Sequence, residues 1–129
     1  MITSKARQAY VAAVAAQYVR LPGTPLRASR QDRRLAAAIH DRGVSLPVVW
    51  AAFVLAAARW AIRGPMQRRL DPIRTLYYFL PAIDEVLENT PEPGYVHYLA
   101  AKLRPLVREK EALLASSGRG HKPALPDGR

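Results

Sequence analysis

The chain contains no cysteine. This excludes a disulfide framework and a thiolate metal site, and it fits a reducing, cytoplasmic environment. The three histidines, His40, His97 and His121, do not have the spacing of metal ligands, and we find no GxSxG, phosphate-loop or GxGxxG pattern. We therefore expect no metal, no cofactor and no catalytic residues, which indicates a protein that is not an enzyme.

Long hydrophobic runs are also absent. The longest one, Leu46 to Ala58, ends at Arg59 and is shorter than the roughly 20 residues that a membrane-spanning helix needs. The N-terminal stretch MITSKARQAYVAAVAAQYV is interrupted by glutamines and has no cleavage signal after it, which is typical of an amphipathic helix rather than a signal peptide. The sequence thus predicts no membrane partner.

Acidic residues are scarce in the first part of the chain. The net charge of +10 falls entirely within residues 1–74, whereas residues 75–129 contain equal numbers of basic and acidic side chains. Most of the excess is arginine, whose planar, permanently charged guanidinium suits phosphate. A one-sided basic surface of this kind favours a polyanionic partner, although arginine-rich composition can also produce an ordinary solvated surface.

What the sequence has in abundance is alanine and helical periodicity, which predict an all-α bundle of about five helices. We expect helices over about 4–20, 29–43, 45–63, 71–89 (kinked or divided at Pro81) and 95–115. Ser29 and Ser45 are expected N-caps, and the third helix, apolar on nearly every side, is expected to be central. Residues 1–115 then form one domain and residues 116–129 a disordered tail.

The turn Gly43-Val44-Ser45, followed by Val49, matches a helix-turn-helix motif. In such a motif the N-terminal side chains of the second helix contact base edges. Leu46, Pro47 and Trp50 occupy those positions and offer little hydrogen bonding to bases. This helix is better interpreted as core than as a reader of base sequence.

The arginines are the better candidates for contact with nucleic acid. If the second and third helices pack antiparallel, several arginines meet at one end of the bundle. The candidate phosphate-binding residues are Arg27, Arg30, Arg33, Arg34, Arg63, Arg68, Arg69 and Arg74.

Two further clusters have an ordinary and a functional interpretation. Asp84, Glu85 and Glu88 are carboxylates of the kind that hold Mg²⁺ or do acid–base work, but their spacing favours a solvated face or salt bridges to the basic half. The aromatic run 77–79 follows Arg74, so a tyrosine there can stack on single-stranded bases or lie half-buried at the core.

The segment DRGVSLPVVWAAFVLAAAR has a G-hydrophobic-Ser pattern, and a later segment has Phe79, Ile83 and Leu87 at intervals of four residues. Together they resemble the C-terminal helical domain of DnaD-like replication proteins of bacterial primosomes and mobile elements, in which the later helix has the pattern Tyr-x-x-x-Ile-x-x-x-Trp. The resemblance covers residues 29–88. It implies binding to DNA and to partner replication proteins.

The sequence thus predicts a small, non-enzymatic nucleic-acid-binding accessory protein with little sequence specificity, and the resemblance implies a role in replication or in a mobile element. DNA is the expected partner. The alternative is a helical protein-interaction module that docks an acidic partner, such as a replication protein, through its basic face. The oligomeric state and the choice between single-stranded and duplex nucleic acid stay open.

Overall fold

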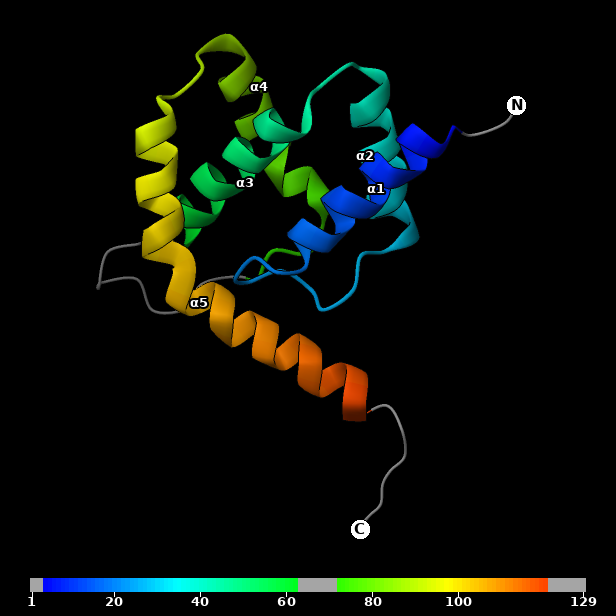
Figure 1. Cartoon of the computed structure of the whole chain (residues 1–129), viewed down its shortest axis with the longest axis vertical. Coiled ribbons are helices and arrows are strands. Elements are labelled where there is room, and N and C mark those ends of the chain that lie inside the picture. Colours follow the sequence, from blue (N-terminus) through cyan, green and yellow to red (C-terminus); the bar gives the residue numbers. More distant parts are fainter. Residues whose placement is uncertain (1–3, 63–71, 121–129) are drawn as a thin grey trace.

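A computed structural model describes residues 4–62 and 72–120, and within these ranges the chain is all-α, as predicted (Figure 1). The described residues contain no β-strand, and none of their helices combines the length and the apolar character needed to cross a membrane. In chain order the elements are α1 (Lys5–Tyr18), α2 (Arg30–Asp41), α3 (Leu46–Ala61), the 3₁₀ helix η1 (Leu76–Phe79), α4 (Leu80–Glu88) and α5 (Pro93–Gly120).

Serine side chains begin the first three helices. Ser4, Ser29 and Ser45 each accept a hydrogen bond from the backbone N–H three residues further on, which satisfies a donor that has no partner inside the helix. Ser29 and Asp32 form a complete capping box, and Gly43 follows α2 with a φ of 83°. The predicted caps of α2 and α3 are therefore confirmed, because these signals act locally.

The core surrounds α3, and this confirms its predicted central position. Residues 52–58 of α3 are all buried, and the helix packs against α4, α5 and α1. The expected antiparallel packing of the second helix on the third is wrong, since α2 packs mainly on α1. Ala15 of α1 and Ala36 of α2 are both buried, and such small side chains allow helices to pack closely.

The fourth expected helix begins later than predicted. The proposed cap Asp71 lies outside the described residues, and Pro72 to Thr75 are not helical. The N–H of Ile73 donates to the carbonyl oxygen of Gly23 at 2.7 Å, and the N–H of Leu76 donates to Oδ1 of Asp32 at 2.9 Å. These tertiary bonds fix the backbone outside a helix. Two short helices, η1 and α4, follow, which agrees with the expected break near Pro81.

Helix α5 continues to Gly120, past the expected boundary at residue 115. It changes direction near its middle, as Figure 1 shows, and Pro105 lies inside it. Proline removes one backbone hydrogen bond and its ring crowds the preceding turn, so a bend is expected there. The bend carries the second half of α5 toward the C-terminal end of α1.

A buried lysine joins α5 to the end of α1. Nζ of Lys110 donates to the carbonyl oxygens of Val19 (2.6 Å) and Leu21 (2.9 Å) and to the hydroxyl oxygen of Thr24 (2.7 Å). Only 6% of Lys110 is exposed, and burial lowers its pKa to about 8. The surrounding acceptors favour the ammonium, which lies where the α1 dipole attracts positive charge.

Tyr18 carries a buried hydroxyl for which the described residues supply no hydrogen-bond partner. Its ring packs edge-to-face on Phe79, with centroids 6.0 Å apart. A buried hydroxyl without a partner loses the hydrogen bonds it makes to water in the unfolded chain. We expect Tyr18→Phe to raise the free energy of unfolding by about 1 kcal/mol in urea denaturation. A decrease of similar size would instead mean that the hydroxyl has a partner.

Gly23 adopts a φ of 84°, and a Cβ built there would lie 2.5 Å from the ring of Trp60. Alanine at this position would be strained in its backbone and would also displace the indole. Gly23→Ala should lower the free energy of unfolding by roughly 2 kcal/mol, because a conformational and a steric penalty combine. Gly43→Ala is the matched control, since Gly43 has the same φ but open space around it. Equal losses for both variants would show that contact with Trp60 is unimportant.

Candidate nucleic-acid interface

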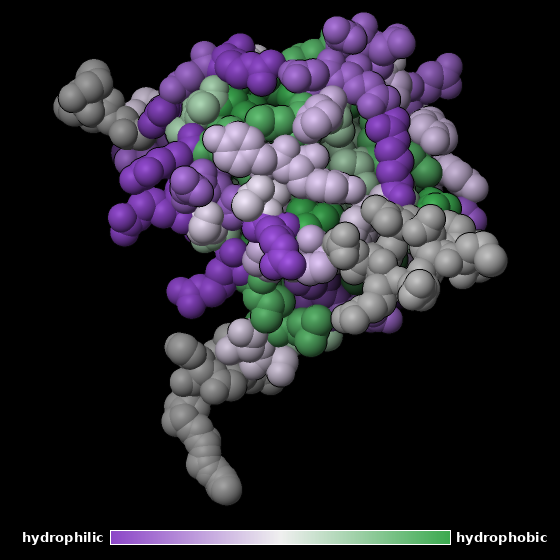
Figure 2. Space-filling model, turned by 180° about the vertical axis from the view of Figure 1, so that it is seen from behind, coloured by the Kyte–Doolittle hydropathy of each residue, from purple (hydrophilic) through white to green (hydrophobic). Residues whose placement is uncertain are grey.

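Four of the predicted arginines lie on the part of the molecule formed by α1, α2 and the loop between them. Two neighbouring depressions lie there, one lined by Arg30, Arg33 and Arg34 and the other by Arg27 and Arg33. Because Arg33 borders both, all four belong to one continuous surface. All four are exposed, and Figure 2 shows hydrophilic side chains gathered along this side, at the left of the view. We call Arg27, Arg30, Arg33 and Arg34 the α2 arginine cluster.

Four arginines outside the predicted set, Arg7, Arg20, Arg42 and Arg59, are neutralised by carboxylates. Arg7 and Arg59 each donate two hydrogen bonds, the first to Asp41 at 3.0 and 2.8 Å and the second to Glu85 at 2.8 and 2.7 Å. These bonds lower the pKa of both Asp41 and Glu85.

Two more arginines outside the predicted set are paired as well. Arg42 pairs with Asp84, and Arg20 pairs with Glu111. Asp84 and Glu85 thus bind the basic half of the chain, which was one of the two structural roles predicted for the acidic stretch.

The α2 arginine cluster has no such pairing. Among the residues that the structure describes, no carboxylate lies within ion-pair distance of its members. They are also close to the N-terminal end of α2, where the helix dipole disfavours positive charge. Asp32 is the acidic residue of that first turn, but it is only 4% exposed and accepts hydrogen bonds from the N–H groups of Ser29 and Leu76. The positive charge of the cluster is therefore uncompensated.

Arg74 is placed near the same end of α2 by the two bonds that hold its segment. Its neighbour Ile73 is bonded to Gly23, and Leu76 is bonded to Asp32, so the backbone of Arg74 runs between the α1–α2 loop and the first turn of α2. Arg74 is exposed and has no carboxylate partner among the described residues. Arg63, Arg68 and Arg69 lie outside the described residues.

The aromatic run after Arg74 is divided by the 3₁₀ helix. Phe79 is fully buried against Phe53 and Tyr18, whereas Tyr77 is 58% and Tyr78 42% exposed. Both tyrosines, rather than one, are therefore accessible. The neighbouring Arg74 adds a positive charge, a combination that suits stacking on unpaired bases.

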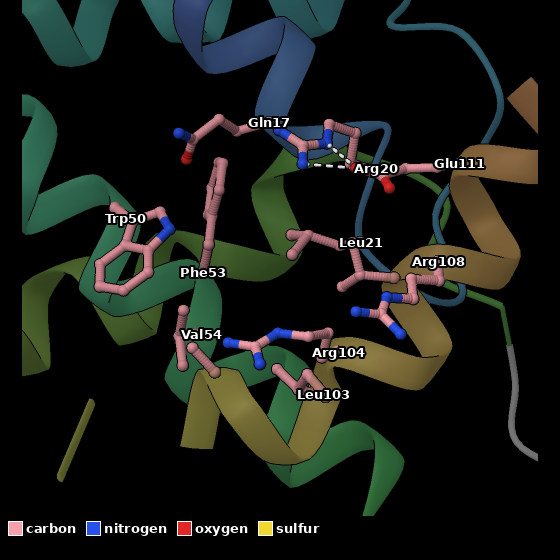
Figure 3. A pocket seen from close by; sticks show the side chains of 12 residues that line it. Gln17, Arg20, Leu21, Trp50, Phe53, Val54, Leu103, Arg104, Arg108 and Glu111 are labelled. Atoms are coloured by element: carbon pink, nitrogen blue, oxygen red, sulfur yellow. Dashed lines mark hydrogen bonds and ion pairs between the residues drawn. The ribbon is translucent and has the colours of Figure 1, made fainter. Parts of the chain in front are cut away.

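A separate groove of about 370 Å³ lies between the C-terminal end of α1, the first half of α3 and the bent part of α5 (Figure 3). Its apolar wall includes the half-buried Trp50 and the buried Phe53, and α5 contributes Arg104 and Arg108 on the opposite side. We call it the aromatic groove. Nε of Arg20 donates to Glu111 at 2.8 Å along its upper edge.

The sequence-based candidates do not include Arg104 and Arg108. Residues 75–129 are neutral as a whole, so the net charge did not indicate that arginines in this part of the chain are functional. One signal was present, because the two arginines are four residues apart and therefore lie on the same face of a helix. In residues 4–62 and 72–120, no group of three or more His, Asp or Glu side chains is arranged to hold a metal ion.

No protein-family model matches this chain, and no curated protein or solved structure matches it. The functional argument therefore depends on the chemistry of the surface.

Proposed function

We propose that the chain is a small, non-enzymatic nucleic-acid-binding accessory protein that holds the phosphate backbone through arginines. The observation that carries the proposal is the division of the described arginines of residues 1–74 into two classes. Arg7, Arg20, Arg42 and Arg59 form ion pairs, whereas the α2 arginine cluster and Arg74 meet no carboxylate among the described residues. Uncompensated arginines at one end of a helix raise the affinity for phosphate.

Binding of this kind has little sequence specificity, because phosphate contacts do not read base edges. The exposed N-terminal residues of α3, Leu46 and Pro47, offer no hydrogen-bonding side chains, which argues against base recognition by this helix. The exposed Tyr77 and Tyr78 beside Arg74 favour some preference for single strands. DNA is the nucleic acid that we propose, and the cytoplasm the compartment.

A role in replication or in a mobile element is the more specific form of the proposal, and it depends on the DnaD-like resemblance of residues 29–88. Phe79 and Ile83 are fully buried, while Leu87 is 47% exposed. In this chain the first two residues of that pattern serve the core. Any DNA contact would then come from the α2 arginine cluster rather than from α4.

The second candidate function is a protein-interaction module. It is favoured by the exposed Tyr95 and Tyr98 in the first turns of α5, at 52% and 56%, because tyrosine is enriched in protein interfaces. In this alternative the basic face docks an acidic protein, such as a replication protein, instead of nucleic acid.

The two candidates are separated by electrophoretic mobility of labelled 30-nucleotide single-stranded and duplex DNA at low salt. We expect the protein to retard both, with no dependence on base sequence. If neither is retarded, the nucleic-acid proposal is wrong and the interaction module becomes the better account. Ultracentrifugation of the protein alone then reports whether two copies associate, as an interface at the exposed Tyr95 and Tyr98 would allow.

A further inference from the structure

From the aromatic groove we infer a second binding site, for a small organic anion with one or two aromatic rings. The site is independent of the proposed nucleic-acid function, because it lies between α1, α3 and α5 rather than on the α2 arginine cluster. Its volume of about 370 Å³ is at the lower end of the range typical of small-molecule sites.

The apolar side of the groove suits a flat ring. Trp50 is half-buried and lies beside Phe53 in the groove wall, while Leu103 and Val54 complete the floor (Figure 3). Aromatic side chains attract other rings in offset or edge-to-face arrangements, which add to the burial of apolar area. An aromatic body therefore gains more from this wall than an aliphatic chain of similar size.

The opposite side of the groove specifies negative charge. Arg104 and Arg108 extend from consecutive turns of α5 toward the groove, and no carboxylate among the described residues pairs with either (Figure 3). Arg20, by contrast, is already neutralised by Glu111. The groove thus has two uncompensated guanidinium groups facing an aromatic wall, an arrangement that suits a carboxylate, sulfonate or phosphate attached to a ring.

Three probes separate the requirement for aromatic rings from the requirement for negative charge. 2-Naphthoate has both the rings and the charge, 2-naphthalenemethanol has the rings without the charge, and decanoate has the charge without the rings. Each is titrated into the ¹⁵N-labelled full chain, and the two indole N–H signals, assigned with Trp60→Phe, are followed. We expect saturable 2-naphthoate binding that shifts the Trp50 signal, and at least tenfold weaker binding of the other two probes.

Variants locate the site. Arg104→Gln with Arg108→Gln should weaken 2-naphthoate binding at least tenfold, whereas Lys102→Gln, an exposed lysine of the same helix outside the groove, should change it less than twofold. Circular dichroism checks that the double variant is folded. If it does not fold, the single variant Arg108→Gln gives the same test with a smaller loss. No saturable 2-naphthoate binding, equally tight decanoate binding, or an affinity unchanged in the arginine variants would overturn the inference.

Discussion

Replacing two unpaired arginines, Arg30→Gln with Arg34→Gln, should weaken DNA binding about 30-fold at 0.1 M salt, because two phosphate contacts are lost. Both side chains are exposed and make no ion pair with the described residues, so the fold should be unaffected. The measurement is fluorescence anisotropy of a labelled oligonucleotide, with circular dichroism of both proteins.

The matched control is Arg42→Gln with Arg59→Gln. It removes the same charge from the same half of the chain, but from arginines that are paired with Asp84 and Glu85. We expect less than about a threefold loss of affinity, since a neutralised guanidinium contributes little to phosphate binding. Equal losses in the two double variants would mean that total charge, and not the α2 arginine cluster, governs binding.

Lys110→Met should cause the largest loss of stability that we expect from one substitution, about 3 kcal/mol in the free energy of unfolding. Methionine fills a similar volume but donates no hydrogen bond. The carbonyl oxygens of Val19 and Leu21 would then be left without the donor that Lys110 supplies. Urea denaturation followed by circular dichroism measures the change.

Lys102→Met is the control for this prediction, because Lys102 lies on the same helix but is exposed, with its Nζ 5.5 Å from the centre of the Tyr98 ring. Such a surface substitution should change stability by less than about 0.5 kcal/mol. A Lys110→Met protein as stable as this control would show that the ammonium does not hold α5 to the end of α1.

Local signals in the sequence predicted local structure well. Ser29 and Ser45 cap their helices through side-chain bonds to residues three positions away, and such bonds depend little on the rest of the fold. The predicted start of the fourth helix was wrong, because the actual start depends on hydrogen bonds from Ile73 and Leu76 to residues far away in the chain. The pairing of α2 with α1 likewise reflects tertiary packing that helical periodicity does not specify.

The candidate site was likewise predictable from the sequence only in part. Charge counting identified Arg27, Arg30, Arg33 and Arg34, and these proved to be exposed and without carboxylate partners among the described residues. It gave no reason to consider the aromatic groove, because that groove combines Trp50 with side chains fifty or more residues later, on the bent α5. The spacing of Lys110 from Val107 and Leu103 does place it on the apolar stripe of α5, a sign of burial that sequence analysis can use.

The central claim is that uncompensated arginines hold a phosphate backbone, and the salt dependence of DNA binding tests it most directly. The affinity for a duplex oligonucleotide is measured by anisotropy between 50 and 300 mM KCl, a range over which phosphate contacts weaken by orders of magnitude, roughly in proportion to their number. With the four arginines of the α2 arginine cluster engaged, log K should fall with log salt at a slope of about −3.6 or steeper. A slope near zero, or no measurable binding at 50 mM, would contradict the account.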